Sequence, residues 1–229
     1  MHGAAVLVAS GARGASASAC TTPLETERAG RRASRFEQPV LHVAAIACSA
    51  GGIAALRQLL GALPHHFPAA IVVLLHWPSN RPLHLESVRR SITLPMAVPR
   101  NGQAVEPGIV FFAAPGRHLL LAPNGRFFLS DSPRLHFMRP SADLLFESLA
   151  ATYRKRAIAV ILTGAGRDGS IGVKSVKAAG GTVIAQNEAT AKYFQMPEAA
   201  IQTGCVDLVL ALPEIASTLL DLVAEPDDR

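Results

Sequence analysis

Three side chains that together could perform nucleophilic catalysis are Ser49, His76 and Asp168, and each follows a short apolar run in the sequence. A serine hydroxyl is a weak nucleophile unless a neighbouring base takes its proton. An imidazole, with an ordinary pKa of ~6.5, can act as that base at neutral pH. A carboxylate bound to the other ring nitrogen fixes the imidazole tautomer and stabilises its cation. The three residue types therefore indicate acyl transfer through serine.

Each of these residues also has a plain structural interpretation. Serine before a helix is commonly an N-cap, histidine at the end of an apolar strand can belong to the core, and aspartate in GRDGS is a common turn residue. Cys48 is a rival nucleophile, but its place in an apolar run favours a buried, inert thiol. The chain order Ser, His, Asp excludes the usual α/β-hydrolase plan, and no G-x-S-x-G motif surrounds Ser49. Other histidines are expected in loops or turns as solvated groups: His65, His66, His84, His118 and His136.

The apolar runs predict strands buried on both faces of a parallel sheet, because they are short and carry no charge. They are Val43–Cys48, Ala69–Leu75 and Ala157–Thr163. Segments with the three-and-four apolar spacing of a helix alternate with them, at Ile53–Leu63, Leu83–Arg90, about Arg139–Tyr153 and Ser170–Ala179. Parallel strands bring their carboxyl ends to one edge of the sheet, so Ser49, His76 and Asp168 are expected to meet there.

The alternation of strands and helices predicts an α/β fold with a doubly wound, mostly parallel sheet and helices on both faces. From Pro107 the sequence reads GIVFFAAPGRHLLLAPNGRFFLSDSP, three short β runs separated by Pro-Gly and Pro-Asn-Gly, which predict antiparallel pieces and a β hairpin at one edge of the sheet. Residues 38–229 form the predicted domain. Residues 1–37 are rich in Ala, Gly, Ser, Thr and Arg and are predicted to be a disordered extension; a signal peptide is disfavoured by the short apolar core with no preceding positive charge.

Composition excludes several classes of protein. A chain of 229 residues with 49% hydrophobic content can bury one large core. The sequence has no run of 18 apolar residues, so no membrane-spanning helix is predicted. The net charge of +5 includes five arginines against three glutamates in residues 1–37, and the remaining excess is scattered, which argues against nucleic-acid binding. The three cysteines lack metal-ligand or disulfide spacing, so we expect no metal and a reducing, cytoplasmic location.

A rival interpretation is a dinucleotide site. Gly164, Gly166 and Gly169 form a G-x-G-x-x-G motif after a strand and before a helix, with Glu188 about 20 residues further on. Against this, Asp168 would place a carboxylate beside the pyrophosphate.

Five stretches of the sequence form a set: ACSAGG, LLHWP, RPSADLLF, LTGAGRDGSIG and AQNEATAKYFQMPEAAIQTGCVDLVLAL. Taken in this order, they resemble five parts of the CheB-type methylesterases: the turn with the serine, the end of the strand before the histidine, the start of a helix, the loop with the aspartate, and the C-terminal stretch. Enzymes of this family demethylate glutamate methyl esters on bacterial chemoreceptors. The resemblance runs from about Val43 to Val223.

The resemblance implies a serine hydrolase with Ser49 as nucleophile, His76 as base and Asp168 as orienting residue. It would release methanol from a glutamate γ-methyl ester, and in some relatives also deamidate glutamine, with no cofactor. The amides of Ala50 and Ala165 would hold the oxyanion, and Arg139 is a candidate for orienting the substrate or bracing the site. Family members commonly carry threonine and methionine at the two alanine positions, so these differences bear on substrate specificity.

Family members also commonly carry an N-terminal receiver domain, for which about 40 irregular residues are too few. The expectation is therefore constitutive activity or control by a separate response regulator, with a methylated chemoreceptor or another signalling protein as the partner. The alternative is a catalytically inert scaffold that retains the fold and binds a signalling complex.

Overall fold

The computed structural model describes residues 42–78 and 85–224. The predicted disordered extension at residues 1–37 and the domain boundary at residue 38 lie outside the described residues. The start of the predicted helix at Leu83, and His84, lie outside them as well.

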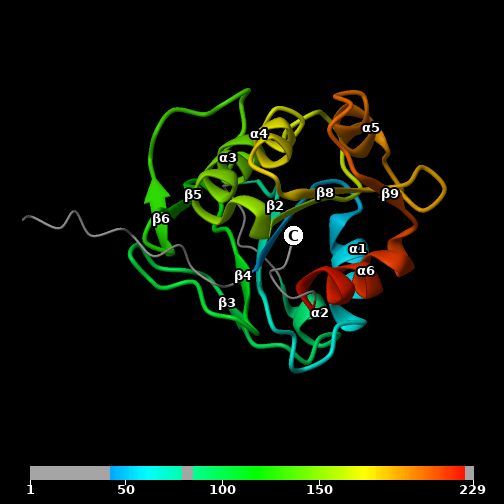
Figure 1. Ribbon diagram of the computed structural model, residues 1–229, viewed down its shortest axis with the longest axis horizontal. Coiled ribbons are helices and arrows are strands. Elements are labelled where there is room, and N and C mark those ends of the chain that lie inside the picture. Colours follow the sequence, from blue (N-terminus) through cyan, green and yellow to red (C-terminus); the bar gives the residue numbers. More distant parts are fainter. Residues whose placement is uncertain (1–41, 79–84, 225–229) are drawn as a thin grey trace, which may run out of the picture. The chain divides into compact units, whose positions relative to one another are not determined.

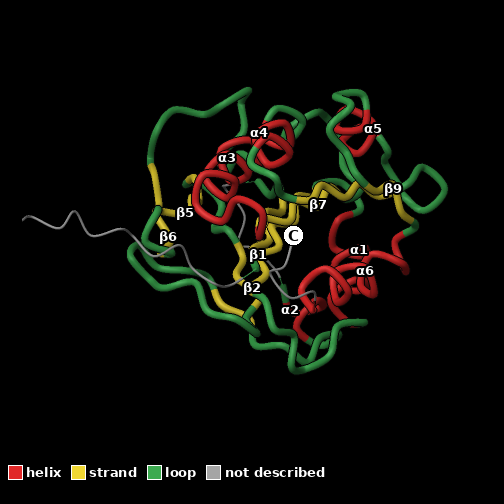
Figure 2. Tube along the Cα trace, viewed as in Figure 1, coloured by secondary structure: helices red, strands yellow, loops and turns green. Residues whose placement is uncertain are grey.

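The main sheet of the described residues has seven strands, all parallel, in the order β3-β4-β2-β1-β7-β8-β9. Figure 1 labels β3, β4, β2, β8 and β9, and Figure 2 labels β1 and β7. Their bounds are β1 Val43–Cys48, β2 Ala70–Leu75, β3 Met96–Ala97, β4 Val110–Phe112, β7 Ala157–Ile161, β8 Thr182–Gln186 and β9 Leu208–Leu210. The three runs predicted as buried strands are β1, β2 and β7, and every residue of these strands is buried. The predicted parallel sheet is confirmed.

Helices cover both faces of this sheet (Figure 2). One face carries α1 Gly52–Gly61, α2 Glu86–Arg89 and α6 Leu212–Ala224; the other carries α3 Ala142–Tyr153, α4 Gly172–Ala178 and α5 Gln195–Ile201, and a 3₁₀ turn at Arg154–Arg156 follows α3. Alternate residues of β1 enter different cores, because successive side chains of a strand point to opposite faces. The doubly wound architecture is therefore confirmed.

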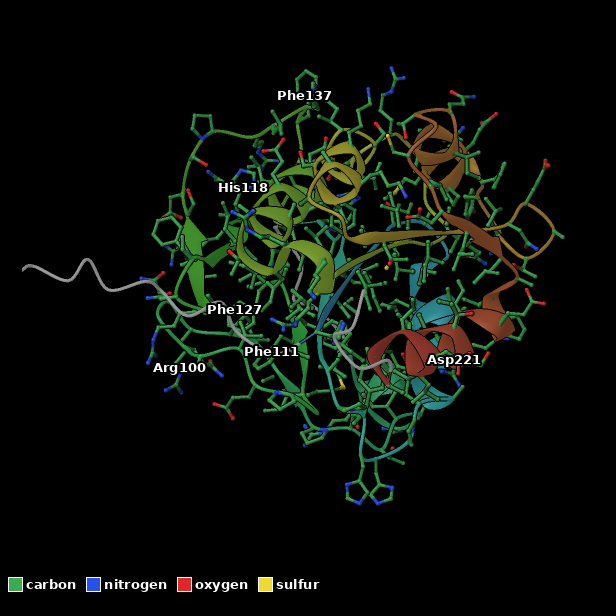
Figure 3. All side chains as sticks on the ribbon, viewed as in Figure 1. Arg100, Phe111, His118, Phe127, Phe137 and Asp221 are labelled. Atoms are coloured by element: carbon green, nitrogen blue, oxygen red, sulfur yellow. The ribbon has the colours of Figure 1, made fainter. Side chains whose placement is uncertain are left out.

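The predicted hairpin forms a separate two-stranded antiparallel sheet of β5 His118–Ala122 and β6 Arg126–Ser130. It packs beside α3, where Thr152 Oγ1 donates to the Leu121 carbonyl. The rings of Phe111 on β4 and Phe127 on β6 lie 4.7 Å apart and join the hairpin to the main core (Figure 3). The first of the three predicted antiparallel runs is β4, which instead joins the parallel sheet. All three of its residues are buried, as a strand covered on both faces requires.

The connections place a switch point beside β1. The chain passes from β1 through α1 to β2 on one side, whereas β7 lies on the other side of β1 and leads through α4 to β8. Connections that diverge in this way leave a crevice at the carboxyl ends of the strands, where ligands of α/β proteins bind. Ser49, His76 and Asp168 follow β1, β2 and β7, so the topology brings them to this crevice.

The close approach of α3 and α4 depends on Gly172. A Cβ at this position would lie 2.7 Å from the Phe146 Cβ and 2.8 Å from the Asp143 carbonyl oxygen. We therefore predict that Gly172→Ala lowers the free energy of unfolding by about 1–3 kcal/mol, through overpacking. Lys174→Ala on the exposed side of α4 is the matched control and should change it by less than ~0.5 kcal/mol. Urea denaturation measures both, and equal stability of the two variants would contradict the prediction.

Candidate active site

Ser49 lies between the ends of two neighbouring strands. Its amide donates to the Thr163 carbonyl at 3.1 Å, and the amide of His76 donates to the Cys48 carbonyl at 2.9 Å. Helix α1 begins with Gly51 as its N-cap, in the left-handed region at φ +80°. The N-cap interpretation of Ser49 is therefore wrong, and no side-chain hydrogen bond caps the start of α1.

Thr163 fixes the turn that carries Ser49. Its hydroxyl donates to the Ala50 carbonyl at 3.0 Å and accepts from the Tyr193 amide at 2.9 Å, while its amide donates to Gln186 Oε1 at 2.8 Å. Three separate segments of the chain are thus tied to one residue. Thr163 lies in the stretch LTGAGRDGSIG, but nothing in that stretch predicts its contacts with Ala50, Gln186 and Tyr193, which are distant in the sequence.

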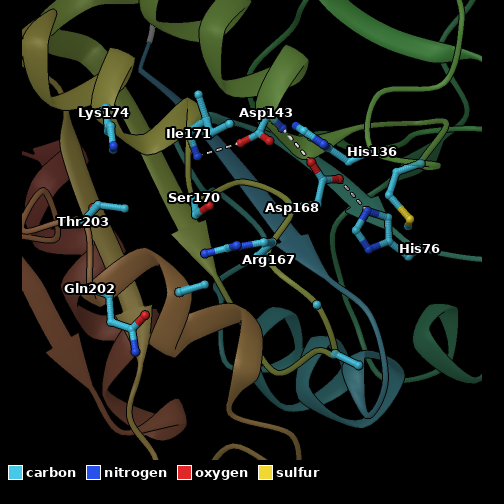
Figure 4. Close-up of a pocket in the computed structure, with 14 residues that line it drawn as sticks. His76, His136, Asp143, Arg167, Asp168, Ser170, Ile171, Lys174, Gln202 and Thr203 are labelled. Carbon is cyan, nitrogen blue, oxygen red and sulfur yellow. Dashed lines mark hydrogen bonds and ion pairs between the residues drawn. The ribbon is translucent and has the colours of Figure 1, made fainter.

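His76 and Asp168 form the pair that the sequence predicts. His76 Nε2 and Asp168 Oδ2 are 2.8 Å apart, and each side chain is only 6% exposed (Figure 4). The other ring nitrogen, Nδ1, is buried and has no hydrogen-bond partner among the described residues. His76 and Ser49 line the same cavity of about 550 Å³. The two groups share a cavity but do not form a hydrogen bond in this structure, and catalytic hydrogen bonds often tighten only when substrate binds.

Asp168 is held at the N-terminus of α3. Oδ1 accepts from Ser141 Oγ at 2.9 Å and from the Asp143 amide at 3.1 Å, and Oδ2 accepts from the Ala142 amide at 2.7 Å as well as from His76. Burial alone would raise the pKa of Asp168, but these hydrogen bonds, with that from His76 the strongest, hold the pKa below its ordinary value. The carboxylate is therefore charged and fixed in direction.

Asp143 accepts hydrogen bonds from the amides at the start of α4, as Asp168 does at the start of α3. Its Oδ1 accepts from the amides of Ile171 and Gly172 at 2.9 and 2.8 Å, directly after the loop that carries Asp168. Burial raises the pKa of Asp143, and the nearby charge of Asp168 raises it further. Asp168, in the loop before α4, thus accepts from free amides at the start of α3, and Asp143 of α3 accepts from free amides at the start of α4.

This arrangement does not fit the dinucleotide interpretation. The helix N-terminus that would bind a pyrophosphate is already occupied by the Asp143 carboxylate. Packing explains why residue 164 is a glycine, because a Cβ there would overlap Met196 Sδ and lie 2.9 Å from the Ser49 Cβ. Gly169 has a φ of +99°, and a Cβ there would lie 3.0 Å from Ile161 Cδ1. The glycines allow close approach of Ser49 and the loop before α4.

His118 was predicted to be a solvated loop residue, and this prediction is wrong. It is fully buried on β5, where its Nε2 donates to the Pro133 carbonyl at 3.1 Å and its Nδ1 accepts from the Ser141 amide at 3.2 Å. Because Nδ1 accepts from an amide, the ring is neutral with its proton on Nε2. His118 therefore holds the residue whose hydroxyl binds Asp168. The apolar run that it begins, HLLLA, was the available signal of its burial.

The remaining predicted site residues have distinct environments. The amides of Ala50 and Ala165 make no hydrogen bond to any residue in the described part of the chain, and their role as an oxyanion hole stays a prediction. Arg139 Nη1 donates to the carbonyls of Asp131 and Ser132 at 3.1 and 3.2 Å, which braces the loop before α3. Burial raises the pKa of the Cys48 thiol far above its ordinary range, so it is an inert core group, as predicted.

The described residues lack two further kinds of feature. None of them forms a cluster of histidine, cysteine, aspartate or glutamate with the geometry of a metal site. Among their helices, none is both long enough and apolar enough to cross a bilayer.

The fold and these side chains define a doubly wound α/β protein with serine, histidine and aspartate at its switch point. The family model for CheB methylesterase matches residues 44–219. A protein-glutamate methylesterase/protein-glutamine glutaminase of Moorella thermoacetica is 40% identical over 206 residues, covering 85% of this chain and 47% of that protein. A second protein with this name, numbered 2, in Burkholderia lata is 41% identical over 190 residues, covering 82% and 56%.

The structural comparison agrees. The crystal structure of the Thermotoga maritima CheB methylesterase catalytic domain matches with a TM-score of 0.75 and 36% identity, covering 80% of this chain and 99% of that domain. This chain belongs to the CheB methylesterase family. It spans about half the length of the curated relatives.

Asp168 makes the stability of the fold depend on pH. Because its pKa is lowered in the folded state, its contribution is complete above the ordinary pKa of ~3.9 and is lost as the pH falls below that value. We expect Asp168→Asn to lower the free energy of unfolding by about 1–3 kcal/mol at pH 7, and the difference from wild type to shrink only as the pH falls below ~3.9 and through the lowered pKa of the folded state. Urea titrations at several pH values test this. Asp221→Asn, on the exposed side of α6, serves as control, and a difference for Asp168→Asn that does not vary with pH would contradict the assignment.

His118 should act as a positioning residue for Asp168. His118→Gln removes the acceptor for the Ser141 amide, whereas His118→Asn keeps an oxygen close to the position of Nδ1. We expect a fluorophosphonate probe to label Ser49 roughly ten- to a hundred-fold more slowly in the glutamine variant, because small displacements of an orienting group are costly, and much of the rate to return with asparagine. Equal labelling rates at equal stability would show that His118 serves packing alone.

Proposed function

We propose that this chain hydrolyses the γ-methyl ester of glutamate side chains on a chemoreceptor-type signalling protein, with Ser49 as the nucleophile. The observation that carries the proposal is the state of His76: Asp168 holds Nε2, Nδ1 is buried and has no partner among the described residues, and the His76 side chain lines the same cavity as Ser49. An imidazole that is held at one nitrogen and has no hydrogen-bond partner at the other suits proton transfer from a hydroxyl. The names of the relatives support the reaction class.

In the first half of the reaction, Ser49 Oγ attacks the carbonyl carbon of the ester and its proton passes to His76 Nδ1. The carbonyl oxygen becomes an oxyanion, which the amides of Ala50 and Ala165 stabilise by hydrogen bonds. The intermediate then collapses. The bond to the methoxy group breaks, His76 Nδ1 returns the proton to that oxygen, and methanol leaves an acyl group on Ser49.

In the second half, water attacks the acyl carbon while His76 Nδ1 takes its proton. The bond to Ser49 Oγ breaks, the serine recovers its proton, and a glutamate carboxylate is released. The carboxylate of Asp168 stabilises the imidazolium in both halves. A glutamine side chain would react by the same steps with ammonia as the leaving group. These steps use no cofactor or metal.

The partners follow as part of the same proposal. The substrate is a methylated chemoreceptor or a related signalling protein, the reaction takes place in the cytoplasm, and a separate response regulator is the proposed source of control. Arg139 acts in this proposal as a brace of the loop before α3, since its guanidinium is engaged by two main-chain carbonyls.

Ser49→Ala should abolish methanol release from a methyl-esterified receptor fragment and leave the fold intact, because the nucleophile is lost and its methylene is retained. Asp168→Asn should lower the rate by roughly two to four decades, since the wrong imidazole tautomer is favoured. Cys48→Ala is the matched control at the neighbouring position and should retain turnover. Methanol measurement and circular dichroism on the same samples test rate and fold.

The results separate the two candidate functions. A chain that folds but releases no methanol, and whose Ser49 is not labelled by a fluorophosphonate, would be a binding scaffold. Turnover that persists in Ser49→Ala would place the nucleophile elsewhere.

A further inference from the structure

The loop between β6 and α3, residues 131–141, carries the most exposed large apolar side chain of the described residues. Phe137 has 90% of its surface accessible, and its ring projects away from the ribbon (Figure 3). An aromatic ring of this size gains considerable free energy when a partner removes it from water. Its exposure therefore leaves the whole ring available to a partner.

The backbone at this position is strained and firmly held. His136 and Phe137 have φ values of +48° and +68°, in the left-handed region that bulky residues avoid. Leu135 and Met138 exchange two main-chain hydrogen bonds of 3.1 and 2.8 Å around them, and Arg134 Nη1 donates to the Phe137 carbonyl at 3.3 Å. Strain of this kind persists only where the surroundings fix it, and it concentrates at binding sites. The loop therefore presents the ring in a defined position.

That position borders the candidate active site. Phe137 and Arg134 line a cavity of about 280 Å³ that also contains His76. On the other side of the loop, His136 and Ala165 line a cavity of about 710 Å³ that again contains His76 (Figure 4). Met138 lines both cavities. The loop thus forms the wall between two openings that lead to the same imidazole.

The rim around these openings is positively charged. Two cationic side chains line each of the three cavities that contain His76: Arg57 and Lys192, Arg134 and Arg139, and Arg167 and Lys174. None of the six forms an ion pair with a carboxylate in the described part of the chain. Among the described residues, the only carboxylates that line these cavities are Asp143 and Asp168, and both are buried. Charge complementarity therefore favours an acidic partner.

We infer that Phe137 is a specificity-determining contact for the protein substrate: it packs against an apolar side chain that lies beside the methyl ester on an otherwise acidic surface. This inference rests on the proposed function. A methyl ester offers little surface of its own, so discrimination between esters must come from neighbouring contacts. A rigid apolar anchor surrounded by unpaired cations supplies both kinds of contact at the edge of the catalytic cavity.

The test uses three esters and measures methanol release as kcat/KM. Two synthetic helical peptides carry a central glutamate γ-methyl ester among glutamates, with leucine or glutamine at the positions one turn before and after it. The third ester is N-acetylglutamate γ-methyl ester amide, which is too small to reach Phe137. We expect wild type to prefer the leucine peptide about tenfold, as burial of one apolar side chain allows.

Phe137→Ala should reduce this preference to about twofold and leave hydrolysis of the small ester unchanged. Phe137→Leu, which keeps an apolar side chain, should retain most of it. Phe128→Ala is the matched control, since Phe128 is half-exposed on β6 and lines none of the three cavities.

The outcomes separate this inference from the proposed function. If wild type hydrolyses the esters without preferring leucine, or if Phe137→Ala keeps the preference, the contact is overturned and the hydrolase stands. A loss of small-ester hydrolysis in Phe137→Ala would also overturn it, because the loop would then be supporting the catalytic geometry. If wild type hydrolyses none of the three esters, the proposed function fails, and the inference fails with it.

Discussion

A buried carboxylate at the start of a helix fixes the geometry on which the candidate site depends. Asp168 has little contact with water, and its charge is maintained because four hydrogen-bond donors replace its hydration. Three of them, from Ser141, Ala142 and Asp143, belong to the start of α3. The position of that helix therefore decides where the carboxylate lies, and the carboxylate decides the orientation of the His76 ring.

A second buried carboxylate makes the arrangement mutual. Asp143 satisfies the amides at the start of α4, so α3 and α4 each depend on the other for the pairing of their free donors. The two acids interact unfavourably, and their pKa values move in opposite directions, with that of Asp168 lowered and that of Asp143 raised. The hydrogen bonds from His76 and from the start of α3 favour the charged form of Asp168, which suits a group that must stabilise an imidazolium.

The parts of the fold that the sequence predicts well are those with an unambiguous local signal. The uncharged runs of β1, β2 and β7 are short, which favours strands buried on both faces, and the Pro-Asn-Gly turn between β5 and β6 is a strong hairpin signal. The β4 run has a similar composition to the hairpin strands, so its local pattern does not say that it pairs in parallel with β2. His118 begins a strand directly after a turn, and only the packing of the hairpin beside α3 buries it.

The sequence by itself determined the chemical groups and the edge at which they gather. Ser49, His76 and Asp168 each follow a strand of one parallel sheet, and parallel strands end on the same side. Tertiary structure decided the rest: which ring nitrogen of His76 binds Asp168, that Thr163, Ser141 and His118 support the site, and that Phe137 stands at its rim. These features arise from contacts between segments far apart in the chain, and neither composition nor periodicity carries information about such contacts.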